Sequence, residues 1–312
     1  MLISFLFFII ACIGIVGSTH FLVKSLFKVE EYYHLREFIV GFLLIGILTS
    51  LPELSVGIIS ALNQISSLSF GNVIGANVVD VALVVGLVAF ISKNIKVEAQ
   101  LEKSTLFIIT AMTFLPLILF LDQELSRIDG AILIVAFFLY VVRLLHVRKK
   151  FKSVKKGKVT KRELHKDIII FIISLAILIA SARLIVYAAS NIAAVLSFPL
   201  ILIGLLIVSP GTSLPELSFE LSCVLKKHSS VALGDLLGSL AFNSTFILGV
   251  VSVISPIKAH FSSFSIGSIF FIISLFMFLI FARTGKEIRK KEGAVLLIIY
   301  ALFVIITFYL NS

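Results

Sequence analysis

One heptapeptide occurs twice in this chain: Thr49–Ser55 reads TSLPELS, and Thr212–Ser218 reads TSLPELS again. The two copies lie inside longer stretches, residues 41–86 and 204–249, which align without a gap at an offset of 163. Fifteen of the 46 aligned positions are identical, and they include the glycine pairs Gly71 with Gly234, Gly75 with Gly238 and Gly86 with Gly249. Apolar composition produces scattered identities, but it does not produce seven consecutive ones that include Pro and Glu. We interpret the two stretches as an internal repeat.

The rest of the chain is much more apolar than a soluble domain. Of its 312 residues, 59% are hydrophobic and 14% are charged, whereas soluble domains contain roughly 25% charged residues. A helix needs about 20 mainly apolar residues to cross a bilayer. The chain offers ten such runs: residues 3–19, 38–62, 70–92, 104–121, 128–146, 167–189, 198–225, 231–255, 264–282 and 293–310. We therefore predict an all-α integral membrane protein of about ten transmembrane helices.

The basic residues predict the orientation of these helices. If the N-terminus is outside the cell, 24 of the 27 Lys and Arg residues fall in cytoplasmic loops, which is the positive-inside asymmetry of membrane proteins. We expect a multi-pass protein of the cell membrane with both termini outside and the 147–166 loop in the cytoplasm. The net charge of +10 does not indicate nucleic-acid binding, because the basic loop lacks interleaved aromatic residues and suits anionic lipid.

Five spans in each half turn the second copy of the repeat upside down. The predicted organisation is a first five-helix repeat at 1–146, a basic cytoplasmic linker at 147–166 and a second, inverted five-helix repeat at 167–312. Inverted repeats whose helices are interrupted at matching positions are typical of secondary transporters, and the interruptions mark the substrate site.

Proline makes the interruption in both copies. Pro52 has no N–H to donate to the carbonyl of Leu48, and Pro215 has none for the carbonyl of Gly211. Unpaired backbone at membrane depth is tolerated where it lines a cavity or meets a ligand. Each motif is therefore predicted to present a free carbonyl oxygen to a ligand.

The neighbouring side chains add further oxygen atoms. Thr49 and Ser50 precede Glu53 by four and three residues, so we expect their hydroxyl groups on the same helix face as its carboxylate. The second copy repeats this arrangement with Thr212, Ser213 and Glu216. Hydroxyl, carbonyl and carboxylate oxygens are the ligands of hard cations such as Na+ and Ca2+.

The helix after each motif carries one more polar residue at mid-bilayer depth. Asp80 lies ten residues into the third span, and Asn243 occupies the equivalent position of the eighth. Carboxylates inside a membrane are unfavourable and mark functional sites. No Lys or Arg lies in the same spans as Glu53, Glu216 or Asp80, so a mobile cation is the simplest counter-charge.

Two further acids, Glu220 and Asp235, have no acidic counterpart in the first copy. Their repeat partners are Gly57 and Asn72. Both acids fall within about five residues of the predicted cytoplasmic surface. We expect solvated carboxylates in a cytoplasmic vestibule; the alternative is an acidic funnel that concentrates cations.

The sequences LTSLPELS…GNVIGANVVD and GTSLPELS…GDLLGSLAFN resemble the two alpha repeats of the cation/calcium exchanger superfamily, most of all its sodium/calcium exchanger branch. The resemblance covers the whole ten-span layout. It implies an exchanger rather than an enzyme, with alternating access, that moves Ca2+ against Na+ through one central site without a cofactor.

The resemblance also assigns residues to that site. The family's two acidic ligands match Glu53 and Glu216. Its hydroxyl and carbonyl ligands match Thr49, Ser50, Thr212 and Ser213, and its positions on the later helices match Ala76, Asp80, Ser239 and Asn243. Leu48 replaces the usual Gly, Ala76 replaces a Ser, and Asp235 stands where Asn is common. A prokaryotic relative has the amide and the carboxylate of positions 80 and 243 the other way round.

Other activities are open on the same residues. Ca2+/H+ antiport needs the carboxylates but none of the hydroxyl oxygens, which favours Na+ as the coupled ion. K+ co-transport is a further alternative. An intramembrane aspartyl protease is disfavoured because Asp80 and Asp235 occupy non-equivalent repeat positions and Asp235 lacks a GxGD context. A channel is disfavoured because inverted, interrupted helices are typical of carriers.

Overall fold

The computed structural model describes residues 2–33, 45–97, 103–147, 161–259, 261–284 and 287–311, and these residues are mostly helical. Where a predicted apolar run is described, it is helical almost throughout. Residues 38–44 of the second run and most of the 147–166 linker lie outside the described residues. Seven helical stretches of the described part are long and apolar enough to cross a membrane: Leu2–Ser25, Ser66–Ser92, Glu163–Leu196, Leu200–Leu225, Ser229–Ile254, Phe264–Thr284 and Lys290–Leu310.

The remaining three predicted runs are helices that are shorter or more charged. Leu51–Leu62 and Leu106–Asp122 are apolar but shorter than 18 residues. The helix Arg127–Val147 contains Arg127, Asp129 and Arg143. The chain is therefore an all-α, multi-pass membrane protein, and the count of ten spans remains a prediction.

The first half is interrupted in two places. Its elements are α1 (Leu2–Tyr33), α3 (Ile45–Thr49), α4 (Leu51–Leu62), α5 (Ser66–Val78), the π-helical turn η2 (Val79–Val84), α6 (Val85–Ser92), β1 (Asn94–Lys96), α7 (Lys103–Leu119), the 3-10 turn η3 (Phe120–Asp122), β2 (Glu124–Leu125) and α8 (Arg127–Val147). The breaks separate α3 from α4 at the TSLPELS motif and place a π turn in the next helix.

The second half repeats this pattern. Its elements are α9 (Lys161–Leu196), α10 (Leu200–Ile203), the π turn η4 (Gly204–Val208), α11 (Ser209–Thr212), α12 (Leu214–Leu225), α13 (Ser229–Ala241), the π turn η5 (Phe242–Ile247), α14 (Leu248–Ile254), β3 (Ile257–Lys258), α15 (Phe261–Thr284), β4 (Glu287–Arg289) and α16 (Lys290–Asn311). The motif helices α4 and α12 both have 12 residues, and α5 and α13 both have 13.

Short strands join the two halves, a feature that the sequence did not predict. β1 pairs antiparallel with β4, and β2 pairs antiparallel with β3. Each pair therefore takes one strand from each half. β1 and β3 follow the third predicted span of their halves, and each pairs with the strand that precedes the last helix of the other half.

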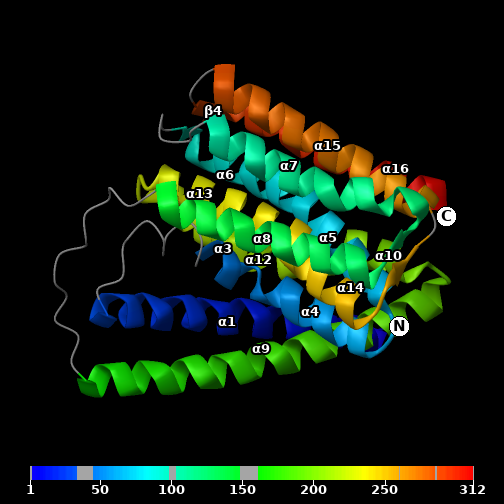
Figure 1. Ribbon diagram of the computed structural model, residues 1–312, viewed down its shortest axis with the longest axis horizontal. Helices are drawn as coiled ribbons and strands as arrows, with labels where there is room; N and C mark the ends of the chain where they lie inside the picture. Colours follow the sequence, from blue (N-terminus) through cyan, green and yellow to red (C-terminus); the bar gives the residue numbers. More distant parts are fainter. Residues whose placement is uncertain are drawn as a thin grey trace.

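The outer helices expose apolar side chains. Figure 1 shows α1 and α9 side by side along one edge of the molecule and α15 and α16 along the opposite edge. Their large aliphatic residues include Ile13, Ile169, Ile273 and Ile298, all at least 40% exposed. Soluble proteins rarely expose apolar surface over such continuous areas, so these faces suit contact with lipid.

Glycine contacts between the halves occur in matched pairs. A Cβ atom added to Gly86 would lie 3.1 Å from the carbonyl oxygen of Gly293, and one added to Gly249 would lie 2.8 Å from that of Gly130. The offset of 163 that relates Gly86 to Gly249 also relates Gly130 to Gly293. The repeat relation therefore extends beyond residues 41–86, and each contact is made twice with the two halves exchanging roles.

The motif helices pack in the same reciprocal way. A Cβ atom on Gly46 of α3 would lie 2.9 Å from the backbone nitrogen of Ser239 in α13. A Cβ atom on Gly75 of α5 would lie 2.5 Å from the Oγ of Ser209 in α11. Position 209 is the repeat partner of Gly46, and position 238, beside Ser239, is that of Gly75. The interrupted motif helix of each half thus lies against the third predicted span of the other half, α3 against α13 and α11 against α5.

Candidate cation-binding site

The two motif helices break at equivalent residues with nearly equal geometry. Ser50 separates α3 from α4 with φ −84° and ψ 8°, and Ser213 separates α11 from α12 with φ −82° and ψ 4°. In each case proline lies in the first turn of the following helix, where its missing N–H is tolerated. The interruption predicted from Pro52 and Pro215 is confirmed.

Asp80 and Asn243 lie in π-helical turns. Each is the second residue of its turn, η2 for Asp80 and η5 for Asn243. Single π turns inside helices are uncommon and often occur at functional sites. Sequence reasoning expected regular helices here, because no residue type signals a π turn.

The hydroxyl groups of each motif contact the opposite half. The Thr49 hydroxyl donates to Oδ1 of Asp235 at 2.9 Å, and Ser50 Oγ lies 3.5 Å from Oε1 of Glu216. In the mirrored position, the Thr212 hydroxyl donates to Oδ1 of Asn72 at 3.1 Å. The sequence predicted a ligand face within each motif helix, but these contacts run between the two halves because α3 packs on α13 and α11 on α5.

Three buried carboxyl groups converge at these breaks. Glu53 is 0% exposed, and Asp80 and Glu216 are 1% exposed. The Thr212 hydroxyl approaches Glu53 and the Ser213 hydroxyl approaches Asp80, but neither contact closes a hydrogen bond of good geometry. Glu216 lies within the range of electrostatic repulsion from both Glu53 and Asp80. The predicted acids of the two halves therefore share one region.

Many polar atoms of this region have no protein partner. Both carboxyl oxygens of Glu53 and of Asp80, both amide atoms of Asn243, the Ser213 hydroxyl and Oε2 of Glu216 are buried without a hydrogen bond. Buried polar groups are nearly always hydrogen-bonded, so such a concentration calls for a ligand. Leaving an unpaired charge buried is unfavourable by about 3–5 kcal/mol.

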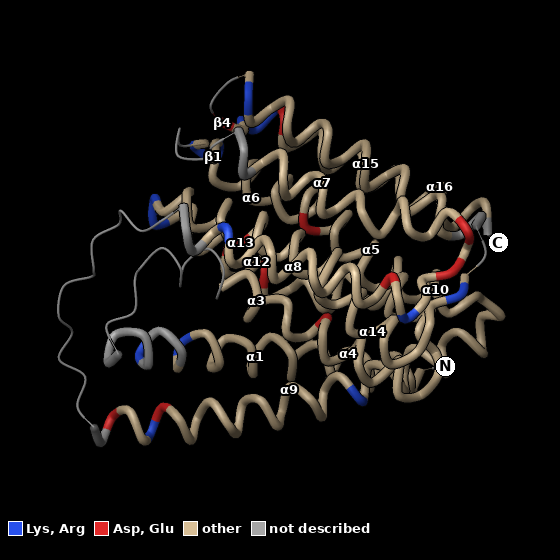
Figure 2. Tube along the Cα trace, viewed as in Figure 1, with Lys and Arg blue, Asp and Glu red and all other residues tan. Residues whose placement is uncertain are grey.

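No protein cation compensates these acids within the described ranges. Ion pairs among the described residues join Lys28 to Asp167, Lys258 to Glu124 and Arg289 to Glu287. Figure 2 shows Lys and Arg gathered toward helix ends, while acidic positions also lie inside the helical body. In the same described residues, no three His, Cys, Asp or Glu side chains form a metal site by themselves, so a bound cation would also need hydroxyl, amide or carbonyl oxygens.

The structure corrects the expectation for Glu220 and Asp235. A solvated vestibule would leave them exposed, but Glu220 is 2% exposed and Asp235 is 0% exposed. Glu220 lies one turn beyond Glu216 on α12, and α13 covers this face of α12. Their burial also rules out an open funnel, because an open funnel needs charges in contact with solvent.

Three polar residues near the site were not predicted as members. Asn72 accepts the Thr212 hydrogen bond, and the amide of Asn77 donates to Oγ of Ser244 at 2.9 Å, again across the halves. The signal for Asn72 was its alignment with Asp235. Ser239, which was predicted as a ligand, donates its hydroxyl to the Leu236 carbonyl of its own helix at 2.9 Å.

Comparison with known proteins identifies related sequences over the whole chain. Residues 3–145 and 166–309 match the family described as sodium/calcium exchanger protein. The sodium/calcium exchanger MaX1 of Methanosarcina acetivorans is 29% identical over 99% of this chain and 99% of its own length. The inner membrane protein YrbG of Escherichia coli (strain K12) is 25% identical over 95% of this chain and 94% of its own.

The fold is also similar to that of a solved exchanger. A structure of the sodium-calcium exchanger NCX_Mj, soaked with Na+ and Sr2+, superposes with a TM-score of 0.70 over 98% of this chain and 99% of that chain. The two sequences are 24% identical. This similarity concerns the fold, and the family match rests on the sequence.

Proposed function

This chain belongs to the sodium/calcium exchanger protein family, and on that premise we propose that it exchanges Ca2+ for Na+ by alternating access at the site between its two motif helices. Membership makes it a cation/Ca2+ exchanger rather than an enzyme. The coupled ion, the ligand residues and the mechanism are the content of the proposal.

The proposed ligands come from four of the predicted spans, the second and third of each half. They are Glu53, Glu216, Asp80, Asn243, Thr49, Ser50, Thr212, Ser213 and Ser239. The observation that supports this set best is the burial of Glu53, Asp80 and Glu216 together, with their oxygens largely unpartnered. Two carboxylates neutralise one Ca2+, and three accommodate several Na+ ions, so the same set of residues can exchange one for the other.

The coupled ion is the main alternative within this proposal. Buried carboxylates can also carry protons, which would give Ca2+/H+ antiport. The hydroxyl groups favour Na+: Ser213 has no partner, and Thr212 donates its proton to Asn72, which leaves oxygen lone pairs available to a cation. A proton would need none of them. K+ co-transport is tested in the same experiment.

The proposal includes an orientation. The two five-helix repeats, 1–146 and 167–312, would lie inverted in a cell membrane, with both termini outside and the 147–166 loop in the cytoplasm. Among the described basic residues, Lys24, Lys28, Lys226 and Lys227 lie near helix ends on the side assigned to the cytoplasm. Cysteine labelling should find Ser153→Cys accessible from the cytoplasm and Ser126→Cys from outside; the reverse pattern would contradict the inversion.

The test of the function is uptake of 45Ca2+ into proteoliposomes that contain the purified protein. An outward Na+ gradient, an H+ gradient and a K+ gradient are applied in turn against the same external Ca2+. We expect uptake to follow the Na+ gradient and to stop when the gradient is dissipated with an ionophore. Uptake driven by the H+ gradient alone, without a response to Na+, would select Ca2+/H+ antiport.

A further inference from the structure

Two acids of the second half remain unexplained by the central site. Glu220 and Asp235 are buried, and their repeat partners Gly57 and Asn72 are neutral. Oε1 of Glu220 and Oδ2 of Asp235 have no hydrogen-bond partner. No described Lys or Arg forms an ion pair with either. Two unpaired carboxyl groups at less than 3% exposure point to a ligand of positive charge.

The two acids face each other across one helix contact. α12 carries Glu216 and Glu220 one turn apart, with Glu220 five residues before its end, and α13 carries Asp235 six residues after its start. Asp235 lies within the range of electrostatic repulsion from both Glu216 and Glu220. The pair therefore extends the central site in one direction only, along α12 toward Lys226.

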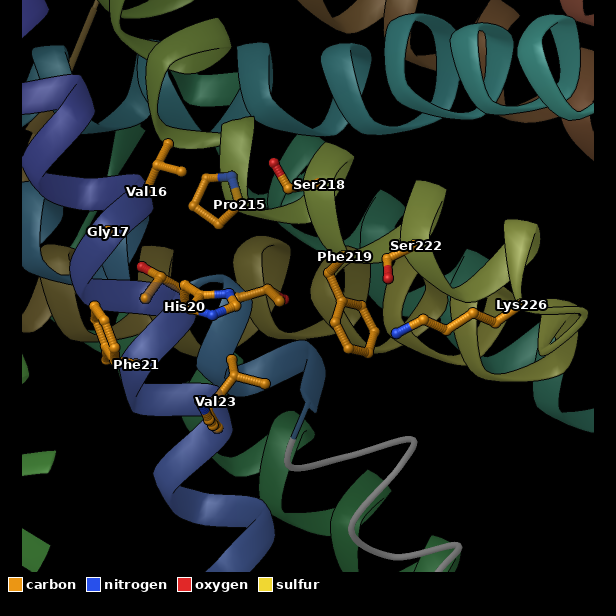
Figure 3. A pocket seen from close by; sticks show the side chains of 13 residues that line it. Val16, Gly17, His20, Phe21, Val23, Pro215, Ser218, Phe219, Ser222 and Lys226 are labelled. Carbon is orange, nitrogen blue, oxygen red and sulfur yellow. The ribbon is translucent and has the colours of Figure 1, made fainter. Parts of the chain in front are cut away.

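A cavity approaches the same place from outside the bundle. It has a volume of about 650 Å³. Figure 3 shows it between α1, which contributes Val16, Gly17 and His20, and α12, which contributes Pro215 and Ser222.

Thr49 connects this cavity to the acids. Its side chain lines the cavity, and its hydroxyl donates to Oδ1 of Asp235 at 2.9 Å. Ser218, Ser222 and Lys226 continue the lining along α12 past the level of Glu220. A cation that enters the cavity meets the Thr49 oxygen, and behind it the carboxyl group of Asp235.

We propose that Glu220 and Asp235, with the Thr49 hydroxyl oxygen, form a second site for a divalent cation between the cavity and the central site. Two carboxylates match the charge of one Ca2+, whereas a monovalent ion would leave one charge uncompensated. Carboxylate and hydroxyl oxygens are suitable ligands for this ion. The site rests on the proposed function only in that Ca2+ is the transported ion, and the first half has no equivalent.

Equilibrium binding of 45Ca2+ to the purified full chain in detergent, without Na+, tests the second site directly. The measurement uses Glu53→Gln, in which the Ca2+ affinity of the central site should fall by about 10- to 150-fold. We expect residual Ca2+ binding in this variant and at least about tenfold weaker residual binding after Asp235→Asn or Glu220→Gln is added. The matched control is Glu287→Gln, which removes an acid paired with Arg289 at the surface. It should leave the residual binding unchanged.

The first half shows that an amide is tolerated at the position of Asp235. Asn72 already occupies the place equivalent to Asp235 and accepts a threonine hydroxyl there, so Asp235→Asn should remain monodisperse on gel filtration. Absence of residual binding in Glu53→Gln would overturn the proposal. So would residual binding that survives Asp235→Asn.

Flux measurements separate this inference from the proposed function. Asp235→Asn should raise the Ca2+ concentration for half-maximal uptake about tenfold when Ca2+ is applied on the Lys226 side, and little from the opposite side. An equal change from both sides would assign Asp235 to the central site and overturn the second site. Loss of Na+ coupling in the unmodified protein would instead refute Na+/Ca2+ exchange and leave the binding result standing.

Discussion

The two halves of the molecule share a backbone frame and differ in where they carry charge. Thr49 and Thr212 make equivalent contacts across the halves, but the first donates to the carboxyl group of Asp235 and the second to the amide of Asn72. Asp80 of the first half has Asn243 as its counterpart in the second half. The break, the π turn and the glycine contacts are common to both halves, so the scaffold is symmetrical and its electrostatics are not.

This difference separates two tasks. Residues that are equal in both halves, such as Glu53 and Glu216, lie at the breaks where both halves meet. Glu220, whose counterpart is Gly57, lies one turn beyond the break on one half only, whereas the unequal pair Asp80 and Asn243 belongs to the central site. Residues that bind the transported ion in every conformation should be present in both halves. Residues that serve access from one side of the membrane should be present in one half.

Removing a shared acid should have the largest effect. Glu53→Gln and Glu216→Gln keep the side-chain shape and remove one negative charge each. Contacts to a charged group contribute about 1.5–3 kcal/mol, so Ca2+ affinity should fall by about 10- to 150-fold and transport should be lost. Na+ binding should weaken less, because a divalent ion loses more from each missing charge. Normal Na+-driven 45Ca2+ flux in Glu53→Gln would contradict the central site.

Exchanging the unequal pair should have the next largest effect. Asp80→Asn leaves two carboxylates, enough for one Ca2+ but too few for several Na+ ions, so Na+-driven exchange should fall more than Ca2+ binding. Adding Asn243→Asp restores the count of three from the other half, and Na+-driven flux should recover. A double variant that is no better than Asp80→Asn would show that the position of the charge, and not its number, matters.

Filling a shared contact between the halves should have a smaller effect, on stability. A Cβ atom on Gly46 would meet backbone atoms of Gly238, Ser239 and Asp235 at 2.9–3.1 Å. Because backbone cannot move aside, Gly46→Ala should lower the free energy of unfolding by about 1–3 kcal/mol, measured as a lower melting temperature in detergent. The control is Gly17→Ala, since a Cβ atom there meets nothing within 4 Å; an equal loss in both variants would refute the packing argument.

The two threonines should show the smallest effect, a difference between equivalent contacts. Thr212→Val removes a hydrogen bond to a neutral amide, worth about 0.5–1.5 kcal/mol, whereas Thr49→Val removes one to a carboxyl group, worth about 1.5–3 kcal/mol if it is ionised. Thr49→Val should therefore be the more destabilising, by about 1 kcal/mol. Combining each change with Asp235→Asn would remove this difference; equal effects in all backgrounds would indicate that Asp235 is uncharged.

The motif predicted more of the molecule than its seven residues suggest. The prolines gave the position of both helix breaks, and the carboxylates Glu53, Glu216 and Asp80 are buried, while their role as cation ligands stays a prediction. These predictions succeeded because a proline at a known place in an apolar helix, and an acid without a basic neighbour, have few structural outcomes.

Sequence patterns within one helix did not predict the contacts between the two halves. Helical spacing relates Thr49 to Glu53 on one helix, but the actual partner of Thr49 is Asp235, 186 residues away. The burial of Glu220 also depends on the helices packed against α12, among them α13 and α6, and not on its own helix. The pair Gly130 and Gly293 carried a usable signal, the same offset of 163, which lies outside the stretch with high identity.

The exchanged glycine contacts have a consequence for how such a chain can change. Gly86 of the first half contacts Gly293 of the second, and their repeat partners Gly249 and Gly130 make the same contact with the halves exchanged. The self-complementary interface of a two-fold homodimer follows the same rule. In a homodimer every substitution appears twice, so an acid at the place of Asp235 would also enter the partner. A single chain that contains both copies is free of that constraint. It can carry an acid at a position of one repeat while the equivalent position of the other repeat stays neutral.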